Sequence, residues 1–156
     1  MKKSSVLFVC LGNICRSPAA ENIFRHVVKK AGLSHEIAID SAGTIGFHSG
    51  KSPDTRMSRT IRQRGYEVGG HARQFSHHDF DAFDLILTMD DENYANVLSL
   101  AKSAAQKDKV RRFTDFCTEH DHDEVPDPYY GRGEGFELVA DLIEDGSSGL
   151  LAHLTK

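Results

Sequence analysis

The chain has 156 residues, a length typical of a single domain. Hydrophobic residues make up 39% of it and charged residues 27%, which suits an ordinary core under a polar surface. The net charge of −4 argues against general attraction to nucleic acid or to an anionic membrane. The three cysteines, Cys10, Cys15 and Cys117, do not make the disulfide framework of a secreted protein, so a cytoplasmic location with reduced thiols is expected. No apolar stretch is long enough for membrane insertion.

The first half of the chain alternates between predicted strands and helices. Residues 6–10 form a nearly continuous apolar run, which is typical of a strand covered on both faces. Ser17 and Pro18 suit the N-cap and the first turn of a helix, and apolar residues at helical spacing follow them. A second strand is expected over 36–43, and a helix is expected over 52–65 between a proline and a glycine.

The second half of the chain continues this alternation. Its predicted elements are a strand over 85–88, a helix over 91–106, a short edge strand over 109–113 and a helix over 136–154. Gly146 and Gly149 lie inside the last helix, and because glycine weakens helices we expect a kink or break there. The alternation predicts one α/β domain over residues 1–156, with a four-stranded, parallel, twisted sheet and helices on both faces. Ligands of such sheets bind beyond the carboxyl ends of the strands, where Cys10 stands.

Residues 10–17, C-L-G-N-I-C-R-S, connect the first predicted strand to the first predicted helix. A loop of this length can turn its backbone N–H groups toward one centre, since Gly12 permits a tight backbone and Asn13 tolerates left-handed geometry. The positive end of the following helix attracts anions, and the planar guanidinium of Arg16 matches two phosphate oxygens. The same surroundings favour the thiolate form of Cys10. The motif therefore predicts a phosphate-binding loop with a nucleophile at its base.

Other roles for Cys10 stay open on these residues alone. Cysteine is commonly a buried core residue with no chemical role. A zinc site is a further option for two nearby cysteines, although only Cys117 and scattered histidines are available to complete it. The nucleotide-binding motif G-x-x-x-x-G-K-[ST] is absent from the sequence, which excludes that kind of phosphate loop.

The motif at 10–17 resembles the signature of the low-molecular-weight protein tyrosine phosphatase family, C-x-x-x-x-x-R-S behind a first strand. Three further matches follow in the family order: DSAGT at 40–44, LTMD at 87–90 and DPYYG at 127–131. The resemblance spans essentially the whole chain. It implies the family's α/β fold and a hydrolase that acts on phosphotyrosine.

The resemblance also implies a role for each matched residue. Cys10 is expected to be the nucleophile, Arg16 to bind the phosphoryl oxygens, and Asp127 to act as general acid and base. The phosphate-binding loop is expected to comprise Leu11, Gly12, Asn13, Ile14, Cys15, Arg16 and Ser17. The residues expected to support this loop are Asn13, Ser17 and Ser41. The residues expected to form the wall around an aromatic ring are Leu11, Phe47, Tyr129 and Tyr130. Cys15 is implied as the partner of Cys10 in a reversible disulfide.

The implied mechanism passes through a phosphocysteine intermediate. It needs the thiolate of Cys10 together with a protonated Asp127, which predicts a bell-shaped pH profile with a mildly acidic optimum. No metal ion or organic cofactor is required. The implied partners are phosphotyrosine-containing proteins, with a bacterial tyrosine autokinase as a candidate, and inorganic phosphate is the product and an inhibitor. No nucleic-acid partner is expected.

One stretch departs from the family pattern. The family usually carries H-x-A-R, with the histidine bonded to the loop asparagine, whereas this chain reads GGHARQF at 69–75. Aligned without a gap, Gly70 takes the place of that histidine, and His71 directly precedes Ala72. We therefore do not expect His71 to support Asn13.

Several alternatives remain for the function and for single residues. An arsenate reductase on the same scaffold would need a further cysteine relay, and only Cys117 lies outside the loop. A cysteine phosphocarrier would have to keep its phosphate, whereas Asp127 hastens hydrolysis. A phosphotyrosine-binding module without catalysis is a third option. Asp127 before Pro128 is also good turn chemistry, and Asp90 is either near the site or only a helix N-terminal acid.

Overall fold

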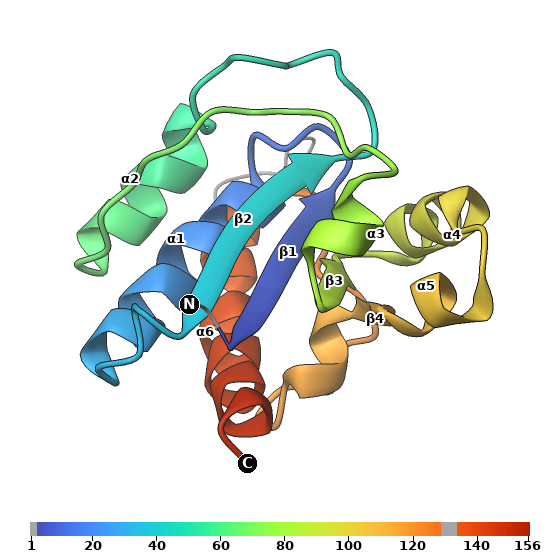
Figure 1. The fold of residues 1–156 in the computed structure, drawn as a ribbon. Coiled ribbons are helices and arrows are strands. Elements are labelled where there is room, and N and C mark those ends of the chain that lie inside the picture. The colour runs from blue at the N-terminus through green and yellow to red at the C-terminus, as the bar shows by residue number, and fades with distance from the viewer. Residues whose placement is uncertain (1–2, 129–133) are drawn as a thin grey trace.

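Four parallel strands form the sheet at the centre of the molecule (Figure 1). The computed structural model describes residues 3–128 and 134–156. The strands are β1 (Ser4–Cys10), β2 (Ile37–Gly43), β3 (Leu85–Thr88) and β4 (Val110–Arg112). Their order across the sheet is β2-β1-β3-β4, so the predicted four-stranded parallel sheet is confirmed. β1 lies inside the sheet, and Cys10 stands at its carboxyl end.

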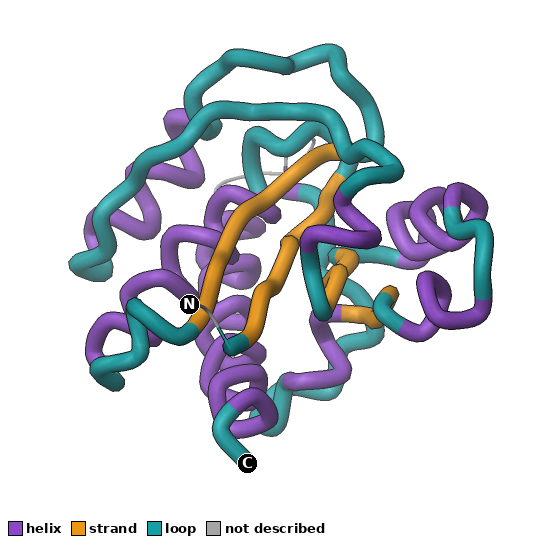
Figure 2. The backbone as a smooth tube through the Cα atoms, viewed as in Figure 1, coloured by secondary structure: helices purple, strands orange, loops and turns teal. Residues whose placement is uncertain are grey.

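Helices cover both faces of this sheet, as the sequence predicted (Figures 1 and 2). The helices are α1 (Arg16–Lys30), α2 (Thr55–Gln63), α3 (Asp79–Ala82), α4 (Asp91–Leu100), α5 (Ala104–Asp108), the 3-10 turn η1 (Phe113–Phe116) and α6 (Glu134–Leu154). Side chains of β1 alternate between two hydrophobic clusters. Phe8 packs in the cluster that includes α1 and α6, whereas Leu7 packs in the cluster that includes α3 and α4. This alternation explains why the apolar run of β1 is continuous.

Aromatic packing fixes β1 from the side of α1 and α6. Phe8 is fully buried and meets the rings of Phe24 and Phe113 edge to face, at centroid distances of 5.8 and 5.9 Å. Burial of one such side chain contributes roughly 1.5–3 kcal/mol. This burial stabilises the strand that ends in Cys10.

The start of α1 differs from the prediction. The helix begins at Arg16 with Cys15 at its N-cap, and that cap makes no side-chain hydrogen bond. The predicted N-cap role of Ser17 is therefore wrong, because Ser17 already lies inside the first turn. Its hydroxyl is turned toward Cys10 and Asn13 instead.

The predicted helix over 91–106 is two helices. α4 ends at Leu100, and α5 begins at Ala104 after Ser103, whose side chain accepts a hydrogen bond from the N–H of Gln106. Serine at an N-cap satisfies a backbone donor that an uninterrupted helix would have paired with a carbonyl, and this explains the break. The short helix α3 was not predicted.

The glycines of α6 do not break it, so that prediction is wrong as well. The helix runs from Glu134 to Leu154 without interruption. A Cβ atom on Gly149 would overlap the carbonyl oxygen of Phe116, and one on Gly146 would overlap the ring of Phe113. Both glycines are therefore needed so that η1 can approach the helix.

No helix within the described parts of the chain is both long and apolar enough to pass through a membrane.

Candidate active site

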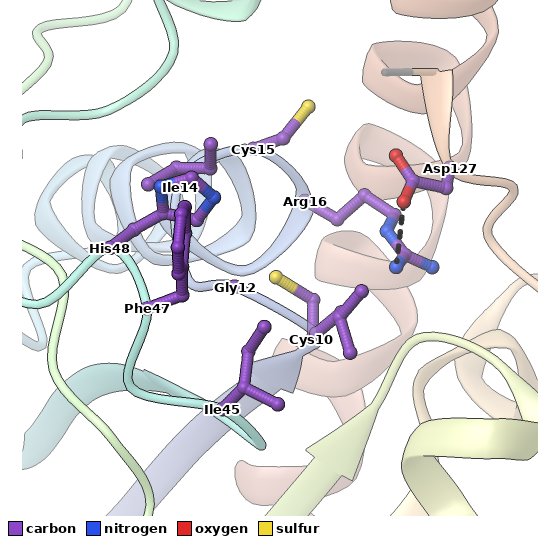
Figure 3. A pocket seen from close by; sticks show the side chains of 10 residues that line it. Cys10, Gly12, Ile14, Cys15, Arg16, Ile45, Phe47, His48 and Asp127 are labelled. Carbon is purple, nitrogen blue, oxygen red and sulfur yellow. Dashed lines mark ion pairs between the residues drawn. The ribbon is translucent and has the colours of Figure 1, made fainter. Parts of the chain in front are cut away.

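A pocket of about 270 Å³ opens where the loop after β1 meets the start of α1 (Figure 3). It is lined by Cys10, Leu11, Gly12, Ile14, Cys15, Arg16, Ile45, Phe47, His48 and Asp127. The pocket lies at the carboxyl end of the sheet, where ligands of parallel sheets bind. It brings together Cys10, Arg16 and Asp127, the residues predicted to be nucleophile, phosphate-binding cation and acid, although Asp127 is more than 110 residues from Arg16 in the chain.

Cys10 lies deep in this pocket, with only 2% of its surface exposed. Its sulfur is 3.0 Å from the hydroxyl oxygen of Ser17. The first turn of α1 contains no acidic residue, so nothing within that turn offsets the positive end of the helix dipole next to the loop. These surroundings suit a bound oxyanion.

Cys15 shares the pocket but has a different environment. Burial raises the pKa of the Cys15 thiol well above its ordinary value, and the neighbouring Cys10 and Asp54 raise it further. Cys15 is therefore a neutral thiol at neutral pH, unsuited to be the nucleophile. Both pocket cysteines are free thiols in the structure.

Asn13 stabilises the loop through hydrogen bonds of its buried side chain. Its backbone is left-handed, with φ of 57°, and its side chain is buried. Its amide group donates to the hydroxyl oxygens of Ser17 at 2.8 Å and of Ser41 at 2.9 Å. The amide oxygen accepts the backbone N–H of Arg73 at 2.9 Å. The three predicted support residues thus form one network, completed by a backbone group that sequence reasoning missed.

His71 takes no part in the described hydrogen bonds of Asn13, and its side chain is exposed. Gly70, at the usual histidine position, has a left-handed backbone with φ of 96°, which disfavours a histidine there. In this chain a backbone N–H of Arg73, and not a histidine side chain, is bonded to the amide oxygen of Asn13.

The side chain of Arg16 is buried and fixed by hydrogen bonds. Only 3% of its side chain is exposed, and one guanidinium nitrogen bonds to Asp90 at 2.7 Å and to the carbonyl oxygen of Val125 at 3.0 Å. The other terminal nitrogen is 3.6 Å from a carboxylate oxygen of Asp127. Burial alone would lower the pKa of Arg16, but Cys10 and the two carboxylates outweigh burial and raise it. The guanidinium therefore stays charged.

Asp90 fulfils both of the alternatives that the sequence left open. One carboxylate oxygen accepts the backbone N–H of Asn93 at 2.8 Å and caps α4. The other oxygen holds Arg16. The signal for this second role is the place of Asp90 two residues after β3, at the same carboxyl end of the sheet as Cys10.

The rim is built mainly by the segment after β2. Phe47 is 78% exposed and stands in Figure 3 on the side of the pocket opposite Asp127. Ile45 and His48 also line the pocket and were not among the predicted wall residues. The N–H of Ile45 donates to the carbonyl oxygen of Leu11 at 3.0 Å, so this segment runs along the loop. The predicted wall residues Tyr129 and Tyr130 lie outside the described residues.

The zinc alternative requires a cluster of ligands. Within residues 3–128 and 134–156, no group of three or more histidine, cysteine or acidic side chains is arranged to hold a metal ion. The groups that do converge at Cys10 are a cation, a helix N-terminus and hydroxyls, which are groups that bind oxyanions.

Comparison with known proteins agrees with this chemistry. The family model described as low molecular weight phosphotyrosine protein phosphatase matches residues 5–156. The low molecular weight protein-tyrosine-phosphatase YfkJ of Bacillus subtilis is 44% identical over 153 residues, which cover 97% of this chain and 96% of that protein. A crystal structure of a protein tyrosine phosphatase from Entamoeba histolytica, with Hepes in the active site, has a TM-score of 0.94 and 42% identity over 97% of each chain.

Another similar structure has a different name. The crystal structure of DARP, described as a Drosophila arginine phosphatase, has a TM-score of 0.90 and 31% identity, covering 100% of this chain and 99% of that one. The fold is thus shared by proteins named for two phosphorylated residues. On the match to the family model and the identity to YfkJ, the chain belongs to the low-molecular-weight phosphotyrosine protein phosphatase family.

Proposed function

We propose that this protein hydrolyses phosphotyrosine and other aryl phosphate monoesters, with one catalytic domain over residues 1–156. The observation that carries the proposal is the arrangement around Arg16. The guanidinium lies beside the loop that holds Cys10, is fixed by Asp90, and is 3.6 Å from Asp127. A nucleophile, a phosphate-binding cation and an acid at one pocket are the parts that phosphoryl transfer needs.

In the first step, the thiolate of Cys10 attacks the phosphorus atom and forms the S–P bond. The P–O bond to the aryl group breaks, its electron pair stays on the leaving oxygen, and Asp127 gives that oxygen a proton. In the second step, the ionised Asp127 takes a proton from water, the oxygen of that water attacks phosphorus, and the S–P bond breaks. The products are inorganic phosphate and the regenerated thiolate.

Arg16 and the backbone of residues 11–17 stabilise the phosphoryl oxygens during both steps. Two contacts of Arg16, to Asp90 and to the carbonyl oxygen of Val125, fix its guanidinium before a substrate arrives. A cation that needs no reorganisation stabilises the transition state more than one that must be ordered. The other terminal nitrogen, which lies 3.6 Å from Asp127, is the one that would bind the phosphoryl group.

The test is turnover of two substrates by three variants. We expect Cys10→Ser to abolish hydrolysis of both phenyl phosphate and p-nitrophenyl phosphate. Asp127→Asn should lower kcat for phenyl phosphate by about 10²–10⁴-fold, because phenolate needs the proton. It should matter much less for p-nitrophenolate, a far better leaving group. Asp123→Asn, an exposed acid four residues earlier, is the matched control. Equal losses on both substrates would contradict the acid role of Asp127.

The identity of the phosphorylated residue needs a direct comparison. Because one similar structure is named as an arginine phosphatase, phosphotyrosine and phosphoarginine peptides of the same sequence should be assayed together. The exposed ring of Phe47 at the rim favours an aromatic leaving group, which can stack against it. Faster hydrolysis of phosphoarginine would contradict the preference for tyrosine.

Arsenate reduction is disfavoured by the third cysteine. Cys117 is half-buried beside η1, and its sulfur donates to the carbonyl oxygen of Leu142 at 3.5 Å. Burial, with a smaller effect of Asp145, raises the pKa of the Cys117 thiol to about 12. Cys117 does not line the pocket that holds Cys10, so it is badly placed to relay a disulfide that starts there. A phosphocarrier role is disfavoured by Asp127 at the same pocket.

The same proposal covers partners, location and redox control. Phosphotyrosine proteins are the substrates, a bacterial tyrosine autokinase is a candidate among them, and inorganic phosphate inhibits as the product. The chain acts in the cytoplasm, where its thiols stay reduced.

Cys15 protects Cys10 by forming a disulfide with it when peroxide oxidises Cys10. Dithiothreitol should then restore activity to the wild type but not to Cys15→Ser, and equal recovery of both would exclude this pairing.

A further inference from the structure

Glu21 is a buried acid that the mechanism does not use. It lies on α1 with only 8% of its surface exposed. One carboxylate oxygen accepts the hydroxyl proton of Ser41 at 2.5 Å. The other accepts a guanidinium proton of Arg25, one helical turn later, at 2.7 Å. A carboxylate in this position needs such partners, since an unpaired buried charge is strongly destabilising.

The hydrogen bonds from Glu21 lead to the sulfur of Cys10. Ser41 bonds to Asn13, Asn13 bonds to Ser17, and the hydroxyl of Ser17 lies 3.0 Å from the sulfur. Ser41, Asn13 and Ser17 are the loop-support residues already described, and Glu21 is the addition. Glu21 is thus the outer end of a continuous chain of side-chain contacts.

The direction of each proton in this chain follows from counting donors. The amide oxygen of Asn13 accepts the N–H of Arg73, so its two amide protons go to Ser17 and Ser41. Each serine hydroxyl accepts one of them and has a single proton left to donate. Ser41 donates its proton to Glu21. The proton of Ser17 has two acceptors in reach, the sulfur of Cys10 at 3.0 Å and the carbonyl oxygen of Ala42 at 3.4 Å, and the shorter contact favours the sulfur.

We propose that Glu21 is a positioning residue for the nucleophile. By accepting the proton of Ser41 it fixes the oxygen on which Asn13 rests, and so holds Asn13 in its left-handed conformation. Asn13 in turn keeps the hydroxyl proton of Ser17 directed at Cys10. In the test below, only the measurement of turnover rests on the proposed function.

Arg25 is the charged partner of the Glu21 carboxylate, at 2.7 Å. A Cβ atom on Gly70 would stand 3.7 Å from a carboxylate oxygen of Glu21, so this glycine borders the acid without supplying a side chain. The left-handed backbone at Gly70 disfavours any larger residue. In this chain the counter-ion therefore comes from α1 itself, through Arg25.

The test is a double-mutant cycle between Glu21→Met, which keeps the length but accepts no proton, and Ser41→Ala. Turnover of p-nitrophenyl phosphate near pH 6 gives kcat and KM. The rate at which iodoacetamide alkylates Cys10, read by mass spectrometry, needs no phosphatase activity. Glu21→Gln keeps an acceptor oxygen for Ser41. Glu67→Gln removes an exposed charge from the groove that Arg25 also lines, and is the matched control.

We expect Glu21→Met to lower kcat and the alkylation rate by about tenfold, with KM within about twofold of the wild type. Glu21→Gln and Glu67→Gln should stay within about threefold. The double variant should be no slower than Ser41→Ala alone, because the two groups act in series. Additive losses, or an unchanged alkylation rate in Glu21→Met, would overturn the proposal. If Glu21→Met does not fold, Glu21→Ala takes its place in the cycle.

The two readouts separate this proposal from the proposed function. A wild-type chain that hydrolyses no aryl phosphate, but whose alkylation rates show the coupling, refutes the phosphatase activity and retains the role of Glu21. A wild-type chain with normal turnover, in which the effects of Glu21→Met and Ser41→Ala on kcat and on the alkylation rate are additive, retains the phosphatase activity and refutes the role of Glu21.

Discussion

Asp145 should anchor the loop that carries the proposed acid. It projects from α6, and its carboxylate accepts the backbone N–H groups of Thr118, Glu119 and His120 at 2.8 to 2.9 Å. The ring of His120 bonds to it as well, at 2.8 Å. The loop that begins here leads to Asp127. We therefore expect Asp145→Asn to destabilise the fold and to loosen this loop.

The size of the effect follows from the pKa of Asp145. Burial alone would raise it, but the hydrogen bonds from Thr118, Glu119 and His120 lower it from 3.8 to about 2. At ~1.36 kcal/mol per pKa unit, the interactions of the ionised carboxylate stabilise the folded protein by ~2.4 kcal/mol. Because the folded-state pKa is the lower one, this stability is present above the unfolded value of 3.8 and is lost as pH falls through about 2.

The assay is urea unfolding of the wild type, Asp145→Asn and the control Asp121→Asn, an exposed acid in the same loop. At pH 5 the free energy of unfolding of Asp145→Asn should be ~2 kcal/mol below that of the wild type, and Asp121→Asn should differ by less than ~0.5 kcal/mol. By pH 3 roughly half of the gap should remain. If the difference in unfolding free energy between the wild type and Asp145→Asn is the same at pH 5 and pH 3, the reasoning is refuted, because the charge of Asp145 would then make no contribution to it.

Three further predictions concern packing, the rim and metal ions. Gly149→Ala should lower the free energy of unfolding by ~1–3 kcal/mol because its methyl group would overlap the Phe116 backbone, whereas the exposed neighbour Ser148→Ala should raise it slightly, as urea titration can show. Phe47→Ala should lower kcat/KM for aryl phosphates by roughly 3–10-fold more than for alkyl phosphates, and equal losses would contradict stacking. EDTA should leave turnover unchanged, and metal-dependent turnover would overturn the mechanism.

The parts of the site that could be predicted are local in sequence. β1, the loop and the start of α1 occupy residues 4–17, and each has its own pattern: an apolar run, a glycine with an asparagine, and an arginine in the first turn of a helix. Residues from elsewhere were found through the resemblance, as for Ser41 and Asp127. Glu21 and the backbone of Arg73 were missed, because nothing in a helix pattern shows that a carboxylate or an N–H group faces a distant loop.

The errors in the helices have a common physical cause. The pattern over 91–106 has enough apolar residues for one helix, but the side chain of Ser103 captures a backbone N–H and starts a new one. In α6 the reverse holds, because Gly146 and Gly149 are poor helix formers that close tertiary packing against η1 requires. Propensity describes the isolated segment, whereas both outcomes depend on neighbouring atoms.

Val125, two residues before Asp127, links the segment that carries Asp127 to Arg16. Val125 is fully buried; its N–H donates to the carbonyl oxygen of Met89 at the end of β3, and its own carbonyl oxygen accepts from Arg16. The chain that carries Asp127 is therefore attached to the same sheet edge from which β1 presents Cys10. Since Arg16 also bonds to Asp90, movement of the guanidinium would shift the acid loop together with the phosphate site. We therefore expect that loss of Arg16 disturbs the proposed proton transfer by Asp127 as well as the proposed binding of phosphate.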